Sequence, residues 1–149
     1  MQLRRAHDED LARVIEIWND AVRATHDFLT DADIRFYLPI VRDQYLPFAE
    51  VWVAEGDADR LTGFVGLTNA KVDALFVDPA AHRQGIGRAL LAHAYGLKGP
   101  LAVDVNEENH PARAFYARLG FREVGRSATD AAGKPHPLIH LASDGEGLV

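Results

Sequence analysis

The stretch "DPAAHRQGIGRALLAHA", residues 78–94, follows directly on the apolar run "VDALFV" at residues 72–77. The apolar run predicts a strand that ends at Pro79, because proline has no N–H with which to continue a ladder. A helical apolar pattern then begins, yet Gly85 and Gly87 occupy its first turn. Glycine is the worst helix former after proline. The two glycines therefore need a reason other than helix formation.

We infer that this turn is an anion site. The first amides of a helix have no partner within the helix and carry the positive end of its dipole. Glycines let phosphate oxygens approach the backbone without meeting a Cβ, and Arg83 and Arg88 add charge at the rim. A tight turn without a ligand is the alternative. It does not require two glycines spaced by one residue with arginines beside them.

Two familiar phosphate-binding motifs fit the turn poorly. A dinucleotide fingerprint requires a third glycine at position 90, where this chain has Leu, although Asp104 lies near the expected position of a ribose-binding acid. A P-loop requires Gly-Lys-Ser/Thr, which is missing from the sequence. A nucleotide binder of the Rossmann kind remains a rival interpretation, and binding of NAD in place of an acyl-CoA would identify it.

The rest of the chain predicts a single α/β domain over residues 1–149. Helices are expected to begin near Asp8, Thr30, the glycine turn and His110, with a kink at Pro39. The third helix is expected to run to about Tyr95, with Gly96 as its C-cap. The expected strands span residues 1–6, 50–55, 61–68, 72–78, 101–106, 121–127 and 136–142.

Composition excludes several classes of site. The chain has no cysteine, which removes disulfides, thiolate metal sites and a cysteine nucleophile, and its histidines have no metal-ligand spacing, so we expect no metal. A net charge of −6 argues against a nucleic-acid partner. No signal-peptide pattern or membrane-length apolar run is present. We expect a cytoplasmic protein without a membrane partner, either monomeric or homodimeric.

Three stretches together resemble the GNAT superfamily of acyl-CoA-dependent N-acetyltransferases. "HRQGIGRALL", preceded by "VDALFVDP", is similar to its Arg/Gln-x-x-Gly-x-Gly/Ala motif, with His82 at the position of the first Arg or Gln. "NHPARAFYARLGF", residues 109–121, matches its second pattern at Asn109, Ala112, Phe115, Tyr116, Gly120 and Phe121. With "ATHDFL", "VNEEN" and "GRSATDAAGKPHPL", the chain most resembles the small bacterial YjaB-like branch.

The resemblance implies a mixed, largely antiparallel sheet with helices on both faces and two splayed parallel strands at its centre. It also implies acetyl-CoA as the co-substrate. The pyrophosphate would lie on the turn formed by Arg83, Gln84, Gly85, Ile86, Gly87 and Arg88. The pantetheine would pair with the strand at Leu75, Phe76 and Val77, whose backbone would polarise the thioester carbonyl, and Asn109 would position the cofactor.

The same resemblance implies that Tyr116 protonates the departing CoA thiolate. The acceptor amine would attack directly in a ternary complex, because neither serine lies in a nucleophile elbow. It could be a protein lysine or a small-molecule amine, bordered by His26, Phe28 and Asn106. A sensor that binds acyl-CoA without turnover is the alternative, although a sensor needs no acid. The base stays open among water and the side chains of His26, Asp27, Asp73, Asp104 and Glu123.

Overall fold

The computed structural model describes residues 1–145 and 147–148, and within them seven strands form one sheet in the order β1-β2-β3-β4-β5-β7-β6. The strands are β1 Gln2–Arg5, β2 Glu50–Glu55, β3 Leu61–Thr68, β4 Lys71–Val77, β5 Ala102–Asn106, β6 Arg122–Ser127 and β7 Leu138–Ala142. The helices are α1 Leu11–Thr25, α2 Asp31–Pro39, α3 Ile86–Lys98 and α4 His110–Arg118. The predicted order of strands and helices is confirmed.

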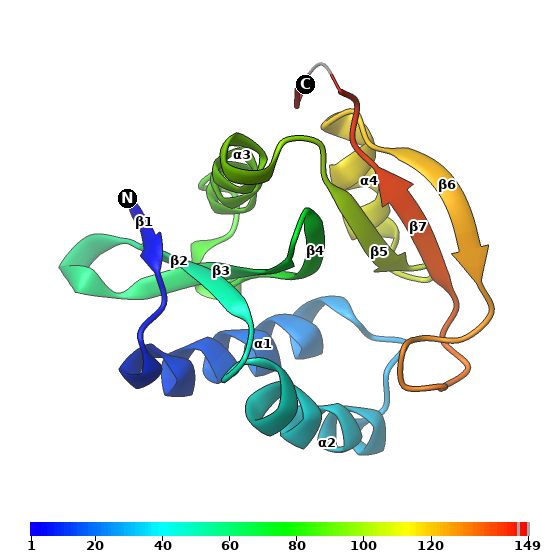
Figure 1. The fold of residues 1–149 in the computed structure, drawn as a ribbon. Helices are drawn as coiled ribbons and strands as arrows, with labels where there is room; N and C mark the ends of the chain where they lie inside the picture. The colour runs from blue at the N-terminus through cyan, green and yellow to red at the C-terminus, as the bar shows by residue number, and fades with distance from the viewer. Residues whose placement is uncertain (146, 149) are drawn as a thin grey trace.

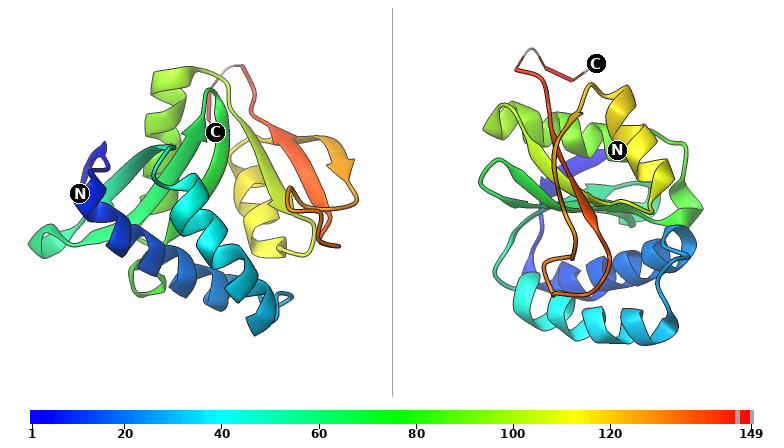
Figure 2. Two further views of the ribbon diagram at one scale, coloured as in Figure 1. Left: turned by 60° about the horizontal axis from the view of Figure 1, so that its bottom comes forward. Right: turned by 90° about the vertical axis from the view of Figure 1, so that its right-hand side faces the viewer.

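Helices cover both faces of the sheet, as Figures 1 and 2 show. On one face Val14 and Ile17 of α1 and Ile34 of α2 share a buried cluster with Phe64 of β3. On the other face Leu90 and Leu91 of α3 share a second buried cluster with residues of α4, β5 and β7. The mixed α/β architecture with helices on both faces is therefore confirmed.

The centre of the sheet opens between β4 and β5. These strands pair in parallel only at Lys71 with Ala102 and at Val72 with Val103, and then diverge (Figure 1). Opposite β3, Gly66 faces Ala74 and Leu67 faces Val72, which leaves Asp73 as an extra residue in β4. An extra residue bends a strand and strengthens its twist. The splay begins at this bulge.

One predicted helix end is wrong. The third helix continues through Gly96 to Lys98, and Gly99, with φ of 78°, ends it. Gly96 lies on an exposed helix face where an added Cβ would meet nothing within 4 Å, so the helix tolerates it. Gly99 takes the positive φ that favours glycine at a helix end.

Several other predicted boundaries also differ in detail. The predicted kink after Pro39 takes the form of a π-helical turn, Ile40–Tyr45, which follows α2 directly. The final strand begins at Leu138 rather than at residue 136. No helix in residues 1–145 and 147–148 is long and apolar enough to cross a membrane.

Candidate active site

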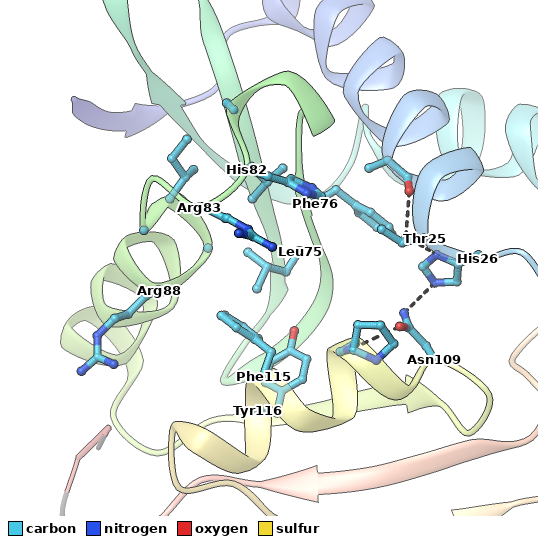
Figure 3. Close-up of a pocket in the computed structure, with 18 residues that line it drawn as sticks. Thr25, His26, Leu75, Phe76, His82, Arg83, Arg88, Asn109, Phe115 and Tyr116 are labelled. Atoms are coloured by element: carbon cyan, nitrogen blue, oxygen red, sulfur yellow. Dashed lines mark hydrogen bonds between the residues drawn. The ribbon is translucent and has the colours of Figure 1, made fainter.

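A cavity of about 330 Å³ opens beside the splay, between the end of α1, the end of β4, the glycine turn and α4 (Figure 3). It gathers most of the residues predicted to bind the cofactor. These are Leu75, Phe76, Val77, Arg83, Gly85, Ile86, Gly87, Arg88 and Asn109. Tyr116 and His26 line it as well. Gln84 is exposed and does not line it, and Phe28 lies outside it, against the rings of His26 and His136.

The two glycines of the turn serve different purposes. Gly85 has φ of 73° and precedes α3, so it supplies a left-handed backbone that other residues adopt at a cost. Gly87 lies inside the helix, where an added Cβ would be 3.3 Å from Cζ of Phe115 in α4. Gly85 therefore shapes the turn, and Gly87 lets α4 approach it.

Unpaired positive charge surrounds the turn. The amides of the first residues of α3 precede its first intrahelical hydrogen bond, which runs from Ala89 N to Gly85 O at 3.0 Å. Arg83 and Arg88 are exposed at the rim (Figure 3), and in the described part of the chain neither forms an ion pair with a carboxylate. The turn thus combines free donors, a helix dipole and two available cations, which suits a phosphate group.

Tyr116 projects from α4 toward the cavity (Figure 3). The residue is only 6% exposed, and no other described group forms a hydrogen bond with its hydroxyl. Burial raises the pKa of this phenol above its ordinary value. The hydroxyl is therefore a protonated donor throughout the neutral pH range.

Asn109 and His26 face each other across the cavity floor. Asn109 Oδ1 accepts from the Ala112 amide at 3.2 Å, which leaves its Nδ2 to donate to His26 Nε2 at 3.2 Å (Figure 3). Thr25 Oγ1 donates to Ala21 O at 2.7 Å, so it accepts from His26 Nδ1 at 2.8 Å. Burial lowers the pKa of His26 to about 4. The imidazole is neutral, and both of its nitrogens are engaged.

A second cavity of about 80 Å³ lies at the splay, lined by residues of β4, β5 and α4 and by His26. Five residues line both cavities: His26, Leu75, Asn109, Ala112 and Tyr116. The second cavity adds Asn106, which was predicted to border the acceptor, and the two candidate bases Asp73 and Asp104. A group in one cavity can therefore meet a group in the other beside Tyr116.

Two of the proposed bases lie away from both cavities. Glu123 is exposed and pairs with Arg113 at 2.8 Å, and Asp27 is an exposed loop residue. Sequence reasoning missed Thr25, which fixes the orientation of His26, and the two partners of Asp104, Lys71 and His140. Of these three residues, only Thr25 could have been found from the sequence, because it is adjacent to His26. Among the described residues, no group of three or more histidines and acids could hold a metal.

Comparison with known proteins points to one family. Residues 47–123 match the model of the acetyltransferase (GNAT) domain. The peptidyl-lysine N-acetyltransferase YjaB of Salmonella typhimurium is 44% identical over 141 residues, which cover 95% of this chain and 97% of that protein.

Solved structures of other proteins share this fold. The solution structure of apo YjaB from Escherichia coli superposes with a TM-score of 0.89 at 40% identity, covering 97% of both chains. The N-acetyltransferase PaiA of Thermoplasma acidophilum, solved in complex with coenzyme A, gives 0.80 at 19% identity, covering 96% of this chain and 98% of that one. At 19% identity, this second likeness shows only that the two proteins share a fold.

Proposed function

Because this chain belongs to the GNAT family of acetyltransferases, we propose that it transfers the acetyl group of acetyl-CoA to the side-chain amine of a lysine in a protein. N-acetyltransferase activity follows from the family and from the 44% identical relative, as the motifs at residues 82–91 and 109–121 predicted. The acceptor is the proposed part. Its support is that this relative is a peptidyl-lysine N-acetyltransferase.

The glycine turn would hold the pyrophosphate of acetyl-CoA. Free amides at the start of α3 supply hydrogen bonds, and Arg83 and Arg88 supply charge from the rim. Beyond Val72, β4 pairs with no described strand on its β5 side, so its edge is free to pair with the amide groups of the pantetheine. The cofactor would then run along Leu75, Phe76 and Val77, with its thioester between the two cavities.

Tyr116 would act as the acid. The neutral amine attacks the thioester carbonyl, the bond from carbon to sulfur breaks, and the phenol gives its proton to the departing thiolate. The nitrogen loses one proton to water as the amide forms, and water returns a proton to the phenolate. Its position in both cavities, its burial and its lack of another hydrogen-bond partner among the described residues support this role. A backbone N–H near Phe76 or Val77 would stabilise the negative charge that develops on the carbonyl oxygen.

Asn109 and His26 would position groups rather than exchange protons. The His26 lone pair already accepts from Asn109, and its pKa of about 4 makes it a weak base at neutral pH. His26 and Asn106 would border the acceptor side, with Phe28 supporting His26 by ring contact. Direct transfer within a ternary complex is consistent with a chain that has no cysteine.

The observation that carries the proposal is the meeting of the two cavities at Tyr116. The test begins with thermal unfolding in the presence of acetyl-CoA or of NAD. Acetyl-CoA should raise the midpoint, because a ligand that binds only the folded state stabilises it, and NAD should not. Release of the CoA thiol is then followed with lysine-containing peptides, free lysine and polyamines. Binding without thiol release for any amine would mean an acyl-CoA sensor, and a preference for small amines would overturn the protein acceptor.

A further inference from the structure

Two carboxylates lie at the point where the central strands separate. Asp73 and Asp104 each follow directly on the last pair of the parallel ladder, Val72 with Val103, and both line the smaller cavity. Tyr116 lines this cavity too, more than nine-tenths buried and with no other described group bonded to its hydroxyl. The acceptor side of the splay therefore brings two acids beside a buried phenol that lacks a partner.

Side chains from neighbouring strands hold Asp104 in place. His140 of β7 lies directly opposite, with its Nδ1 2.6 Å from Asp104 Oδ1, and Lys71 Nζ lies 2.8 Å from Oδ2. His140 Nδ1 donates to the Asp104 carboxylate, and His140 Nε2 lies 2.7 Å from Ser127 Oγ, within hydrogen-bond distance. A Cβ at Gly125 would be 3.2 Å from His140 Cδ2, so this glycine makes room for the ring.

The surroundings of Asp104 favour its ionised form. Burial raises the pKa of the carboxyl, but hydrogen bonds from His140 and Lys71 outweigh burial, and the pKa lies below its ordinary value. Asp73 is held by Thr68 Oγ1 at 2.5 Å and by the Tyr45 hydroxyl at 3.1 Å. A carboxylate has about four acceptor positions. Each acid therefore retains capacity for another donor.

We propose that Asp73 and Asp104 bind the ammonium group of the acceptor, so that the enzyme selects cationic primary amines over uncharged nucleophiles. This inference rests on the proposed function and names the group that its acceptor site recognises. The bound ammonium would give one proton to water before its nitrogen attacks the thioester. Lys71 already shows that Asp104 pairs with a primary ammonium here. Charge-assisted hydrogen bonds of this kind are about twice as strong as neutral ones.

The test compares two nucleophiles in steady-state acetylation by the intact protein. For a lysine peptide, Asp104→Asn and Asp73→Asn should each raise KM by roughly 10- to 100-fold, the cost of losing a hydrogen bond between charged groups, with a smaller change in kcat. For hydroxylamine, which is uncharged at neutral pH, the same variants should keep KM within about twofold, since no charged hydrogen bond is lost. Glu107→Gln is the matched control, because it removes one exposed carboxylate that pairs with Arg126 outside both cavities.

An equal rise of KM for both nucleophiles, or no rise for the lysine peptide, would overturn the inference. Calorimetry with CoA checks that each variant keeps its fold. A wild-type protein that acetylates no amine would refute the proposed function but not this site. In that case butylammonium should still shift the His140 imidazole resonances of the wild type in NMR spectra, and Asp104→Asn should abolish the shift. A wild-type spectrum that butylammonium does not change would refute the ammonium site itself.

Discussion

Asn109 Nδ2 donates a hydrogen bond to His26 Nε2 across 3.2 Å and 83 residues of sequence. His26 ends α1, which packs on the face of the sheet that α2 also covers, and Asn109 caps α4 on the other side of the splay. The same asparagine accepts from the Ala112 amide. One buried side-chain contact therefore joins the end of α1 to the start of α4 beside the candidate active site.

This contact predicts how stability depends on pH. The folded-state pKa of His26, about 4, lies below the ordinary value of about 6.5, so the unfolded chain binds a proton first. The protein should therefore have its full stability, as far as His26 is concerned, above pH ~6.5. The free energy of unfolding should fall by up to about 3 kcal/mol as the pH drops toward 4. Urea unfolding at several pH values measures this slope. His26→Gln should flatten it, and an unchanged slope in that variant would assign the pH dependence to other groups.

Tyr116→Phe should reduce kcat by roughly 10²- to 10⁴-fold, because the ring still packs but the acid is gone. Affinity for acetyl-CoA should change little. Burial raises the pKa of the phenol, so we expect no loss of wild-type rate from its ionisation below about pH 9. Stopped-time assays of thiol release and calorimetry check both points. Tyr95→Phe is the control, since Tyr95 lies on α3 outside both cavities. Near-normal turnover in Tyr116→Phe would mean that another group protonates the thiolate.

Gly87→Val should abolish CoA binding while most of the fold persists. The new side chain would grow into the turn, where even a Cβ would lie 3.3 Å from Phe115. Gly96→Val in the same helix meets open space and should leave CoA affinity unchanged. Arg83→Ala should weaken binding by about 1 kcal/mol, as an exposed charge contact does. Calorimetric titration with CoA measures all three. Unchanged affinity in Gly87→Val would remove the pyrophosphate from this turn.

Asp78→Asn should destabilise the fold by about 1–3 kcal/mol at neutral pH. Asp78 is 8% exposed, accepts from the Ala80 amide and lies 2.5 Å from Arg13 Nη2, so it ties the end of β4 to α1. Burial raises the pKa of the carboxyl, but these contacts outweigh burial and lower the pKa. Its stabilising contribution is therefore present above the ordinary pKa near 4 and is lost as the pH falls through the lower folded value. Chemical unfolding of both proteins should show the difference narrowing in acid, and a constant difference would contradict the ionic origin.

The sequence by itself determined the local structure and the family. Three short motifs carried this information: the proline that follows β4, the glycines of the turn and the pattern from Asn109 to Phe121. They predicted the family, the order of the elements and most of the residues that line the larger cavity. Short motifs predict local structure because the backbone conformation of a turn and the start of a helix depend on residues adjacent in the sequence.

Only the tertiary structure decided which distant groups meet. It brought Phe115 against Gly87, His26 against Asn109 and Lys71 against Asp104. None of these pairs follows from spacing along the chain, because the first two depend on where α4 packs and the third depends on the parallel register of β4 and β5. Burial then set the protonation of His26 and Tyr116, since desolvation acts on a group only once the surrounding elements have closed over it.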